Sequence, residues 1–301
     1  MLNAVETYLT LRRGTGFAMQ NAECLLKSFA AFAAEREQTH VHTQTAIDWA
    51  ALGPSVAQRD ARLKAVCRFA RHLRVEDDRH DLPPANHFGA RKTRRPPHIY
   101  SAGDIDRLIE AALRLRPQGG LRSLTYATLI ALLSATGLRI SEALKLTIAD
   151  VSNEGLLIRE TKFRKTRLVP LHDTAAAGLK RYLARRRPRS DDDPVFIDER
   201  DLPLRYLAVR DIFNRLVSTA GIRSASIRRP RLHDLRHTFA VRALQGSPSG
   251  RSRCGAHMAA LATYMGHVNI YATYWYLEAT ADLMLDVAIA GEAFMSEGRS
   301  A

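Results

Sequence analysis

Apolar residues in the first 75 positions recur every three or four residues, which is the spacing of helices that bury one face. Four helices are expected there, over Ala4–Leu11, Phe17–Ala34, Thr45–Leu52 and from the N-cap Ser55 to about Arg74. Glycine-containing breaks follow the first and the third of these segments. Cys24 and Cys67 fall within these helical patterns, so both are expected to be small core residues.

The fourth predicted helix carries an unusual number of cationic side chains. They are Arg59, Arg62, Lys64, Arg68, Arg71 and Arg74. Such a run is typical either of a solvated helix face or of a surface that faces phosphates, and the pattern alone leaves both interpretations open.

The helical pattern stops at residue 76. Asp77–Pro84 is polar and contains prolines, and Gly89–Pro97 has the sequence GARKTRRPP. A charged, proline- and glycine-containing stretch between periodic segments marks a domain boundary. We therefore expect a helical domain over 1–88, a basic linker over 89–97 and a second domain over 98–301. The linker cations could also follow a DNA backbone.

The second domain is predicted to combine helices with one hairpin. Leu156–Thr161 and Arg167–Leu171 alternate apolar and polar residues as strands do, and the turn Lys162–Thr166 joins them. Ser101 can cap a helix with Asp104 in the capping-box position. Further helices are expected over Leu124–Ser134, which stops before Gly137, and over Thr174–Arg185 and Asp211–Thr219. The predicted fold class is mainly α with a small β-sheet.

The stretch Arg231–Ala240, RLHDLRHTFA, concentrates reactive side chains on a predicted helix. Its apolar residues fit one face, and His233, Arg236 and His237 share a neighbouring face. An arginine fork matches phosphate oxygens, and a histidine can move a proton near neutral pH. Ordinary helix packing and a metal site remain alternatives, because H-D-x-x-H is close to the H-E-x-x-H of zinc proteases.

Composition narrows the class of partner. The 301 residues are enough for two domains, and 46% of them are hydrophobic, so the chain can form buried cores. A net charge of +14 suits a polyanion, most commonly nucleic acid, with an anionic membrane surface as the alternative. No apolar run approaches the roughly 18–20 residues of a membrane span, and the N-terminus lacks the order of a signal peptide. We expect a cytoplasmic protein. Three scattered cysteines argue against a disulfide framework or a cysteine zinc site.

Five motifs follow one another in the second domain: ATGLRISEAL, TKFRKTRLVPL, LHDLRHTFA, MGH and TYWY. In this order and spacing they resemble the tyrosine recombinase, or phage integrase, family of site-specific DNA recombinases. The resemblance spans Arg139 to Tyr276, whereas residues 1–88 match only in being helical and basic, as the family's core-binding domains are. It implies a mixed α/β tyrosine-recombinase catalytic domain behind a helical core-binding domain.

The resemblance carries over residue by residue. The matching positions are Arg139 for the first arginine, Lys162 for the hairpin lysine, His233 and Arg236 for the H-x-x-R pair, His267 for the final histidine, and Tyr276 for the nucleophile. Lys165 is the second candidate for the hairpin lysine. Tyr271 and Tyr274 also lie near, but the family spacing after Gly-His favours Tyr276.

The residue types suit chemistry at a phosphodiester. Two arginines can clamp the non-bridging oxygens as charge builds in the transition state. A tyrosine hydroxyl, with a pKa of about 10, needs a base or a positive field to attack near pH 7, and His233 can accept its proton. The resemblance implies that Lys162 protonates the leaving 5′-oxygen and that His267 orients the phosphate. The product would be a 3′-phosphotyrosyl link, formed without metal, ATP or another cofactor.

The implied function is cleavage and rejoining of double-stranded DNA in the service of a mobile element, by a tetramer on paired sites, with or without partner recombinases. One alternative is a catalytically inactive DNA-binding accessory protein, but all six expected residues are present. A type IB topoisomerase uses similar chemistry, but the N-terminal helical domain and the LRHTFA and GH motifs favour a recombinase. A zinc hydrolase built on His233, Asp234 and His237 explains neither the charge nor the Arg139 and Tyr276 motifs.

One segment departs from the family pattern, in which the turn at this place is mostly shorter, and a second segment follows Tyr276. The 245–260 insertion, QGSPSGRSRCGAHMAA, is rich in glycine, serine and arginine and is predicted to be a loop. After Tyr276, apolar residues within Leu277–Phe294 repeat at helical spacing, which predicts an amphipathic tail helix before Gly291. This tail either folds back on its own domain or, as the resemblance suggests, docks on a neighbouring subunit.

Overall fold

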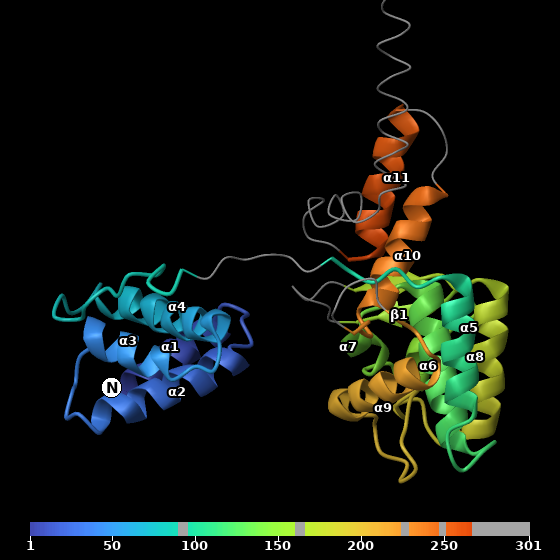
Figure 1. The fold of residues 1–301 in the computed structure, drawn as a ribbon, viewed down its shortest axis with the longest axis horizontal. Helices are drawn as coiled ribbons and strands as arrows, with labels where there is room; N and C mark the ends of the chain where they lie inside the picture. Colours follow the sequence, from blue (N-terminus) through green and yellow to red (C-terminus); the bar gives the residue numbers. More distant parts are fainter. Residues whose placement is uncertain (90–95, 160–165, 224–228, 247–250, 267–301) are drawn as a thin grey trace, which may run out of the picture. The chain divides into compact units, whose positions relative to one another are not determined.

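The computed structural model describes residues 1–89, 96–159, 166–223, 229–246 and 251–266, the last of these with side chains from 256 onwards. The chain forms two compact units, Met1–Arg95 and Pro96–Ala301, and the division falls inside the stretch expected to be a linker. Both units are built mainly from helices, and one small sheet belongs to the second (Figure 1). This confirms the predicted fold class. Within the described ranges, no helix is long and apolar enough to cross a membrane.

The first unit contains four helices around one apolar core. They are α1 (Leu2–Gly14), α2 (Gln20–Ala34), α3 (Thr43–Ala51) and α4 (Val56–Leu73). Phe29, Trp49 and Phe69 are fully buried at their centre. The predicted cap of the fourth helix is confirmed, because Ser55 Oγ accepts a hydrogen bond from the Gln58 backbone N–H at 3.3 Å.

The two cysteines of this unit differ in environment. Cys67 is buried on α4 and its thiol donates to the Pro83 carbonyl at 3.2 Å, as expected of a core residue. The prediction for Cys24 was wrong, because this residue is exposed. Helix α2 buries Leu26, Phe29, Ala30 and Ala33, and this inward face leaves Cys24 on the solvent side.

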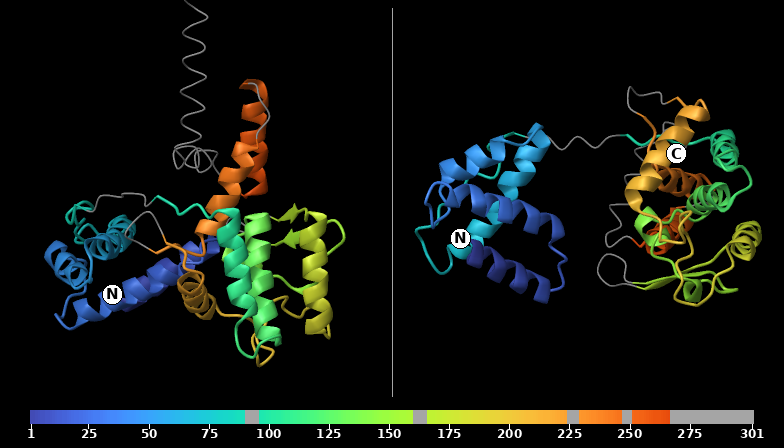
Figure 2. Two further views of the ribbon diagram at one scale, coloured as in Figure 1. Left: turned by 45° about the vertical axis from the view of Figure 1, so that its right-hand side comes forward. Right: turned by 90° about the horizontal axis from the view of Figure 1, so that it is seen from below.

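The second unit is organised around α6. Its described residues form the helices α5 (Ala102–Leu113), α6 (Leu121–Thr136), α7 (Ile140–Ala143), α8 (Asp173–Arg186), α9 (Tyr206–Thr219), α10 (Asp234–Gln245) and α11 (Arg251–Tyr264), with a short 3-10 turn η1 (Ile148–Asp150). Helix α6 contacts α5, α8 and α10, and Figure 2 shows how these helices surround it. Strands β1 (Leu156–Ile158) and β2 (Arg167–Val169) pair antiparallel, with Leu156 opposite Val169. The predicted hairpin strands are therefore present, although each is shorter than expected.

Local signals place the ends of two central helices. The predicted capping box of α5 is confirmed: Ser101 Oγ accepts from the Asp104 N–H at 3.0 Å, and Asp104 Oδ2 accepts from the Ser101 N–H at 2.8 Å. Helix α6 ends at Gly137, whose φ of +60° is the left-handed conformation that glycine adopts without strain. The chain then turns directly into α7.

The prediction of a loop over 245–260 was wrong in its second half, because α11 begins at Arg251. Met258, Leu261 and Met265 are spaced three and four residues apart and pack against Val241 and Leu244 of α10. The glycines and serines at the start of the insertion hid this apolar stripe, whereas the alanine-rich sequence that follows favours a helix.

Candidate active site

Arg139 stands where the chain turns from α6 into α7. It is the N-cap residue of α7, and its backbone N–H donates to Glu142 Oε2 at 3.0 Å. Its guanidinium also donates through Nη1 to Glu142 Oε1 at 2.7 Å and through Nη2 to the Gly266 carbonyl at 3.3 Å. The side chain is still 28% exposed, so part of the guanidinium can meet a ligand from outside.

Arg236 reaches the same turn from α10. Its Nη1 donates to the Gly137 carbonyl and its Nη2 to the Met265 carbonyl, both at 2.6 Å. The residue is buried, at 3% exposure, so its charge is held in place by carbonyl oxygens and not by water. The structure therefore brings together the two arginines that the sequence identified from separate motifs.

His233 is the N-cap residue of α10 and lies at the surface. Partial burial of its ring, together with the positive charges of Arg236 and Arg231, lowers the pKa of His233 below its ordinary value of 6.5. A histidine with a lowered pKa is neutral at pH 7, so it can accept a proton. The positive charge of Arg139 lowers the pKa of His233 in the same direction.

His237, expected on the same face as His233 and Arg236, is buried. Its ring lies edge-on to His233, with centroids 4.8 Å apart, and burial lowers the pKa of His237 to about 3. Asp234 is fully buried and accepts from the backbone N–H and the guanidinium of Arg231 at 2.8 and 2.9 Å. The carboxylate that a zinc hydrolase on this helix would use as its general base is thus already bound by an arginine.

Two further residues complete the cluster, and sequence reasoning did not single them out. Arg167, the first residue of β2, donates to both carboxylate oxygens of Glu142, at 3.2 and 2.9 Å. Burial alone would raise the pKa of the Glu142 carboxyl, but hydrogen bonds and charge from Arg167 and Arg139 hold it below its usual value. The repeated basic residues of TKFRKTRLVPL and the acid three positions after Arg139 were the available signals.

Three arginines converge on the C-terminal end of α11. Successive carbonyls there accept from three different elements: Tyr264 from Arg167 Nε at 2.9 Å, Met265 from Arg236, and Gly266 from Arg139. The end of a helix presents unpaired carbonyls and partial negative charge, so cations are stabilised there. With Glu142 included, the four side chains carry a net charge of +2, from three arginines and one carboxylate.

The remaining predicted residues, Lys162, His267 and Tyr276, lie outside the described residues, as do the lower-ranked candidates Lys165, Tyr271 and Tyr274. Their described neighbours are informative. Strand β2 begins at Arg167, and the described chain ends at Gly266, next to His267 in sequence. Gly266 has a φ of +64°, and a Cβ there would lie 2.9 Å from Arg167 Nη1, so this position favours glycine.

In the described part of the chain, one group of three side chains has ligand atoms of the right kind, close enough together to bind a metal ion. The three are His40, Asp77 and His80 of the first unit. Their atoms already have partners. The Val41 N–H donates to His80 Nδ1 at 3.0 Å, which places the ring proton of a neutral His80 on Nε2. His40 Nε2 lies 3.1 Å from Asp77 Oδ2, and Asp77 also binds Arg79. These hydrogen bonds connect residues 40–41 to residues 77–80, and they fit a structural link between the two segments better than a metal site.

Residues 101–282 match the model of the phage integrase family, which is more than half of the chain. A putative integrase/recombinase y4rB of Sinorhizobium fredii is 37% identical, with 93% of both chains covered. The tyrosine recombinase XerD of Caulobacter vibrioides is 34% identical over 78% of this chain and 75% of its own length.

Solved structures agree on the fold. XerH site-specific recombinase bound to its difH substrate aligns with a TM-score of 0.67 at 17% identity, covering 96% of this chain and 84% of the other. The Tn1549 transposon integrase in complex with transposon end DNA aligns with a TM-score of 0.65 at 18% identity, covering 97% and 99%. On the family match and the sequence identities, the chain belongs to the phage integrase family and is a tyrosine-type site-specific DNA recombinase.

Proposed function

We propose that this recombinase cuts and rejoins DNA through a 3′-phosphotyrosyl intermediate, with Tyr276 as the nucleophile. The observation that carries the proposal is the convergence of Arg139 and Arg236 on the end of α11, from which the chain continues to His267 and Tyr276, with His233 at the start of the helix that carries Arg236. Cations held in fixed positions by protein acceptors can stabilise charge that develops on a phosphate without reorganising.

The proposed roles of Arg139, Arg236 and His233 rest on their environments in the structure, and those of Lys162, His267 and Tyr276 rest on the family resemblance. Arg139 and Arg236 bind the non-bridging oxygens of the scissile phosphate, and neutral His233 accepts the proton of the tyrosine hydroxyl. Lys162 donates a proton to the leaving 5′-oxygen, and His267 orients the phosphate. The attack forms a bond from the Tyr276 oxygen to phosphorus and breaks the bond to the 5′-oxygen. A 5′-hydroxyl of a second strand reverses it, so no cofactor or metal takes part.

The partner is double-stranded DNA, and we infer that the recombinase serves a mobile element. The net charge of +14 supports the first point. A relative titled integrase/recombinase and a structural neighbour titled transposon integrase support the second. Action on DNA also fits the expectation of a cytoplasmic protein. The alternative, a catalytically inactive DNA-binding accessory protein, predicts binding without covalent attachment.

Covalent attachment to DNA distinguishes an active recombinase from a catalytically inactive accessory protein. Duplexes from the DNA flanking the gene, nicked so that cleavage traps the protein, serve as suicide substrates. We expect the unaltered protein to form a covalent adduct and Tyr276→Phe to bind the same DNA without forming one. Tyr274→Phe is the matched control and should still form the adduct. Adducts that persist in Tyr276→Phe and vanish in Tyr274→Phe would move the nucleophile, and absence of any adduct would favour the accessory protein.

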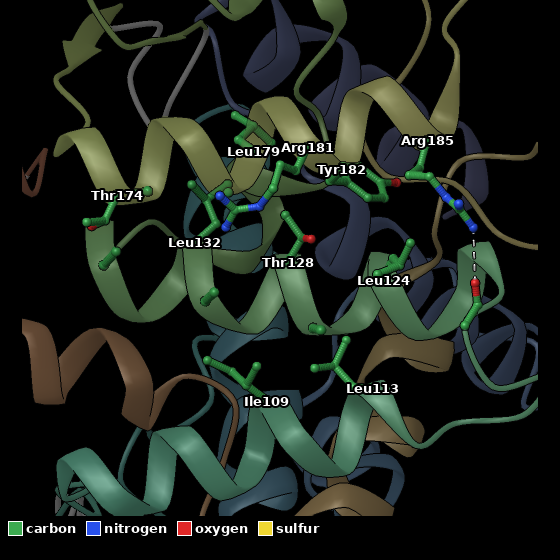
Figure 3. A pocket seen from close by; sticks show the side chains of 16 residues that line it. Ile109, Leu113, Leu124, Thr128, Leu132, Thr174, Leu179, Arg181, Tyr182 and Arg185 are labelled. Carbon is green, nitrogen blue, oxygen red and sulfur yellow. Dashed lines mark hydrogen bonds between the residues drawn. The ribbon is translucent and has the colours of Figure 1, made fainter.

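We also propose that the protein works as a tetramer on paired DNA sites and that a groove on the second unit receives the tail of a neighbouring copy. The groove lies between α5, α6 and α8, has a volume of about 720 Å³, and is shown in Figure 3. Its floor is apolar, with Ile109, Leu124 and Leu132 among the lining residues. Arg181 and Arg185 line it from α8, four residues apart.

The tail has the complementary pattern. Glu278, Asp282 and Asp286 recur every four residues in the predicted helix, beside the apolar Leu283 and Val287. An acidic stripe with the same spacing as the two arginines, next to an apolar stripe, suits a groove with an apolar floor and a basic rim. Contacts of this head-to-tail kind can close into a ring of subunits.

A further inference from the structure

We infer that Arg167 is a positioning residue for the recombination reaction, a role that rests on the proposed function of Arg139 and Arg236. Three contacts carry the inference. The Arg167 guanidinium donates to both oxygens of Glu142 and, through Nε, to the Tyr264 carbonyl. Its side chain is 14% exposed, half the exposure of Arg139. Arg167 thus binds protein acceptors through all three of its nitrogens, whereas Arg139 keeps an open side.

Glu142 links Arg167 to the phosphate-binding arginine. Its Oε1 accepts from Arg139 Nη1 at 2.7 Å and from Arg167 Nη1 at 3.2 Å, so both guanidinium groups are oriented by one buried carboxylate. The carboxylate must stay ionised for this, and the charge of Arg167 helps to keep its pKa low. Without Arg167, Glu142 would have Arg139 as its main cationic partner, and the Arg139 guanidinium would turn further towards the carboxylate.

Arg167 also holds the end of α11. Its bond to the Tyr264 carbonyl is the first of the three successive arginine–carbonyl bonds at residues 264–266. Arg139 and Arg236 must share their donors between these carbonyls and a phosphate, whereas Arg167 does not face this competition. It can therefore keep the segment before His267 in place while the other two arginines engage DNA. Gly266 leaves the space for this approach.

Replacing Arg167 with lysine tests whether this hydrogen-bonding geometry matters. Lysine keeps the positive charge but offers one nitrogen, so it cannot donate to two carboxylate oxygens and the Tyr264 carbonyl in a planar fork. We expect Arg167→Lys to slow covalent adduct formation at saturating protein by about 100-fold, the effect of a roughly 1 Å misplacement of a reacting group. Its affinity for the same nicked duplex should change little, because Arg167 does not contact DNA in this role.

Arg186→Lys is the matched control. Arg186, the last residue of α8, has a side chain that is 5% exposed, and it pairs with Asp193 at 3.5 Å, outside the cluster. It should lose a similar amount of thermal stability without the loss of cleavage rate. Glu142→Gln, which keeps the shape and removes the charge, is a second variant in case Arg167→Lys does not fold, and should slow cleavage in the same direction.

A substrate with a neutral methylphosphonate at the scissile position distinguishes positioning from general destabilisation. If Arg167 acts by orienting Arg139 towards the charged oxygens, the penalty of Arg167→Lys should be clearly smaller on the neutral substrate. An equal penalty on both substrates, or cleavage by Arg167→Lys at the unaltered rate, would overturn the inference. Failure of the proposed function has a different signature, since the unaltered protein itself would then form no Tyr276-dependent adduct.

Discussion

At the scale of single residues, what each arginine of the site can do depends on the hydrogen-bond acceptors that its guanidinium already binds. Arg236 is buried among carbonyls, Arg139 shares Glu142 and keeps an open side, and Arg167 is fully engaged. The three arginines of one cluster therefore differ in their hydrogen-bond partners and in their exposure. His233 is tuned by these neighbours, since a positive surrounding disfavours its protonated form.

This environment predicts the pH dependence of cleavage. The pKa of His233 is lowered, so the neutral base persists at pH 6.5 and cleavage should decline only as the pH falls further. His233→Gln should slow adduct formation by about 10²- to 10⁴-fold, the usual contribution of a positioned base. The measurement is the single-turnover rate against pH, with exposed His172→Gln as the control. A rate that falls already between pH 8 and 7 in the unaltered protein would contradict this assignment.

Circular dichroism must accompany that profile, because a second histidine links pH to folding. The pKa of buried His237 is depressed to about 3 in the folded state. A depressed pKa contributes stability that is complete above the unfolded value of about 6.5 and is lost as the pH falls towards 3. Loss of cleavage from unfolding would thus coincide with loss of helical signal, whereas titration of His233 would not.

Sequence motifs identified Arg139, His233 and Arg236 because each stands in a local pattern. Arg167 and Glu142 were missed, although Glu142 lies only three positions after Arg139, because their contact with each other joins residues 25 positions apart in the sequence. His237 was expected on the same face as His233 and Arg236, and the packing of α10 buries both His237 and Arg236. A spacing rule identifies neighbours on one helix and says little about which of them faces the core.

At the scale of elements, caps and breaks were the dependable signals. Ser55, the Ser101 capping box and Gly137 each ended or began a helix where expected, since each acts through its own backbone neighbours. Helix α11 was missed because its stability comes from apolar contacts with α10, while the glycine and serine before it suggest a loop. Tertiary packing overrode local composition there.

Gly137 ends helix α6 and also contacts the candidate active site through Arg236. Its φ of +60° and its carbonyl bond to Arg236 both belong to the turn that presents Arg139. An added Cβ would lie 2.4 Å from Phe239 Cδ1. We expect Gly137→Ala to lower the free energy of unfolding by about 1–2 kcal/mol from backbone strain and by about 1–3 kcal/mol more from overpacking. Denaturant titration measures the sum, and adduct formation should fall as Arg236 shifts.

Gly221→Ala is the matched control, because Gly221 has a similar φ of +64° but nothing within 4 Å of an added Cβ. It should cost the strain alone and leave cleavage intact. Equal losses of stability in the two variants would show that Phe239 moves aside without cost and that the turn is not tightly packed.

At the scale of the whole molecule, the charge pattern separates two tasks. The chain is strongly basic as a whole, which suits DNA, whereas the segment after Tyr276 carries an acidic stripe. Within the described residues of the second unit, Arg181 and Arg185 line an apolar groove that suits such a segment. In the proposed function, a tail that directly follows the proposed nucleophile couples the position of Tyr276 to the presence of a neighbour, so that a subunit would cut only inside an assembly.

Assembly is tested by removing either half of this proposed contact. Deleting Asp282–Ala301 should leave binding to a single DNA site largely intact and abolish synapsis and recombination of a two-site plasmid. Reversing the basic pair of the groove, with Arg181→Glu and Arg185→Glu, should do the same, because like charges would then face each other.

A second pair of charge reversals, in the tail, makes the test specific to this contact. Adding Asp282→Arg and Asp286→Arg to the reversed groove restores opposite charges across the contact, so recombination should return, measured by plasmid resolution and by the tetramer fraction on paired sites. Arg210→Glu with Arg215→Glu, on the exposed side of α9, controls for the change in net charge and should not be rescued by the tail substitutions. Full recombination by the truncated protein would show that the tail is not the coupling element. Loss without rescue would show that the tail binds elsewhere, since a head-to-tail ring needs each groove filled by the next copy's tail.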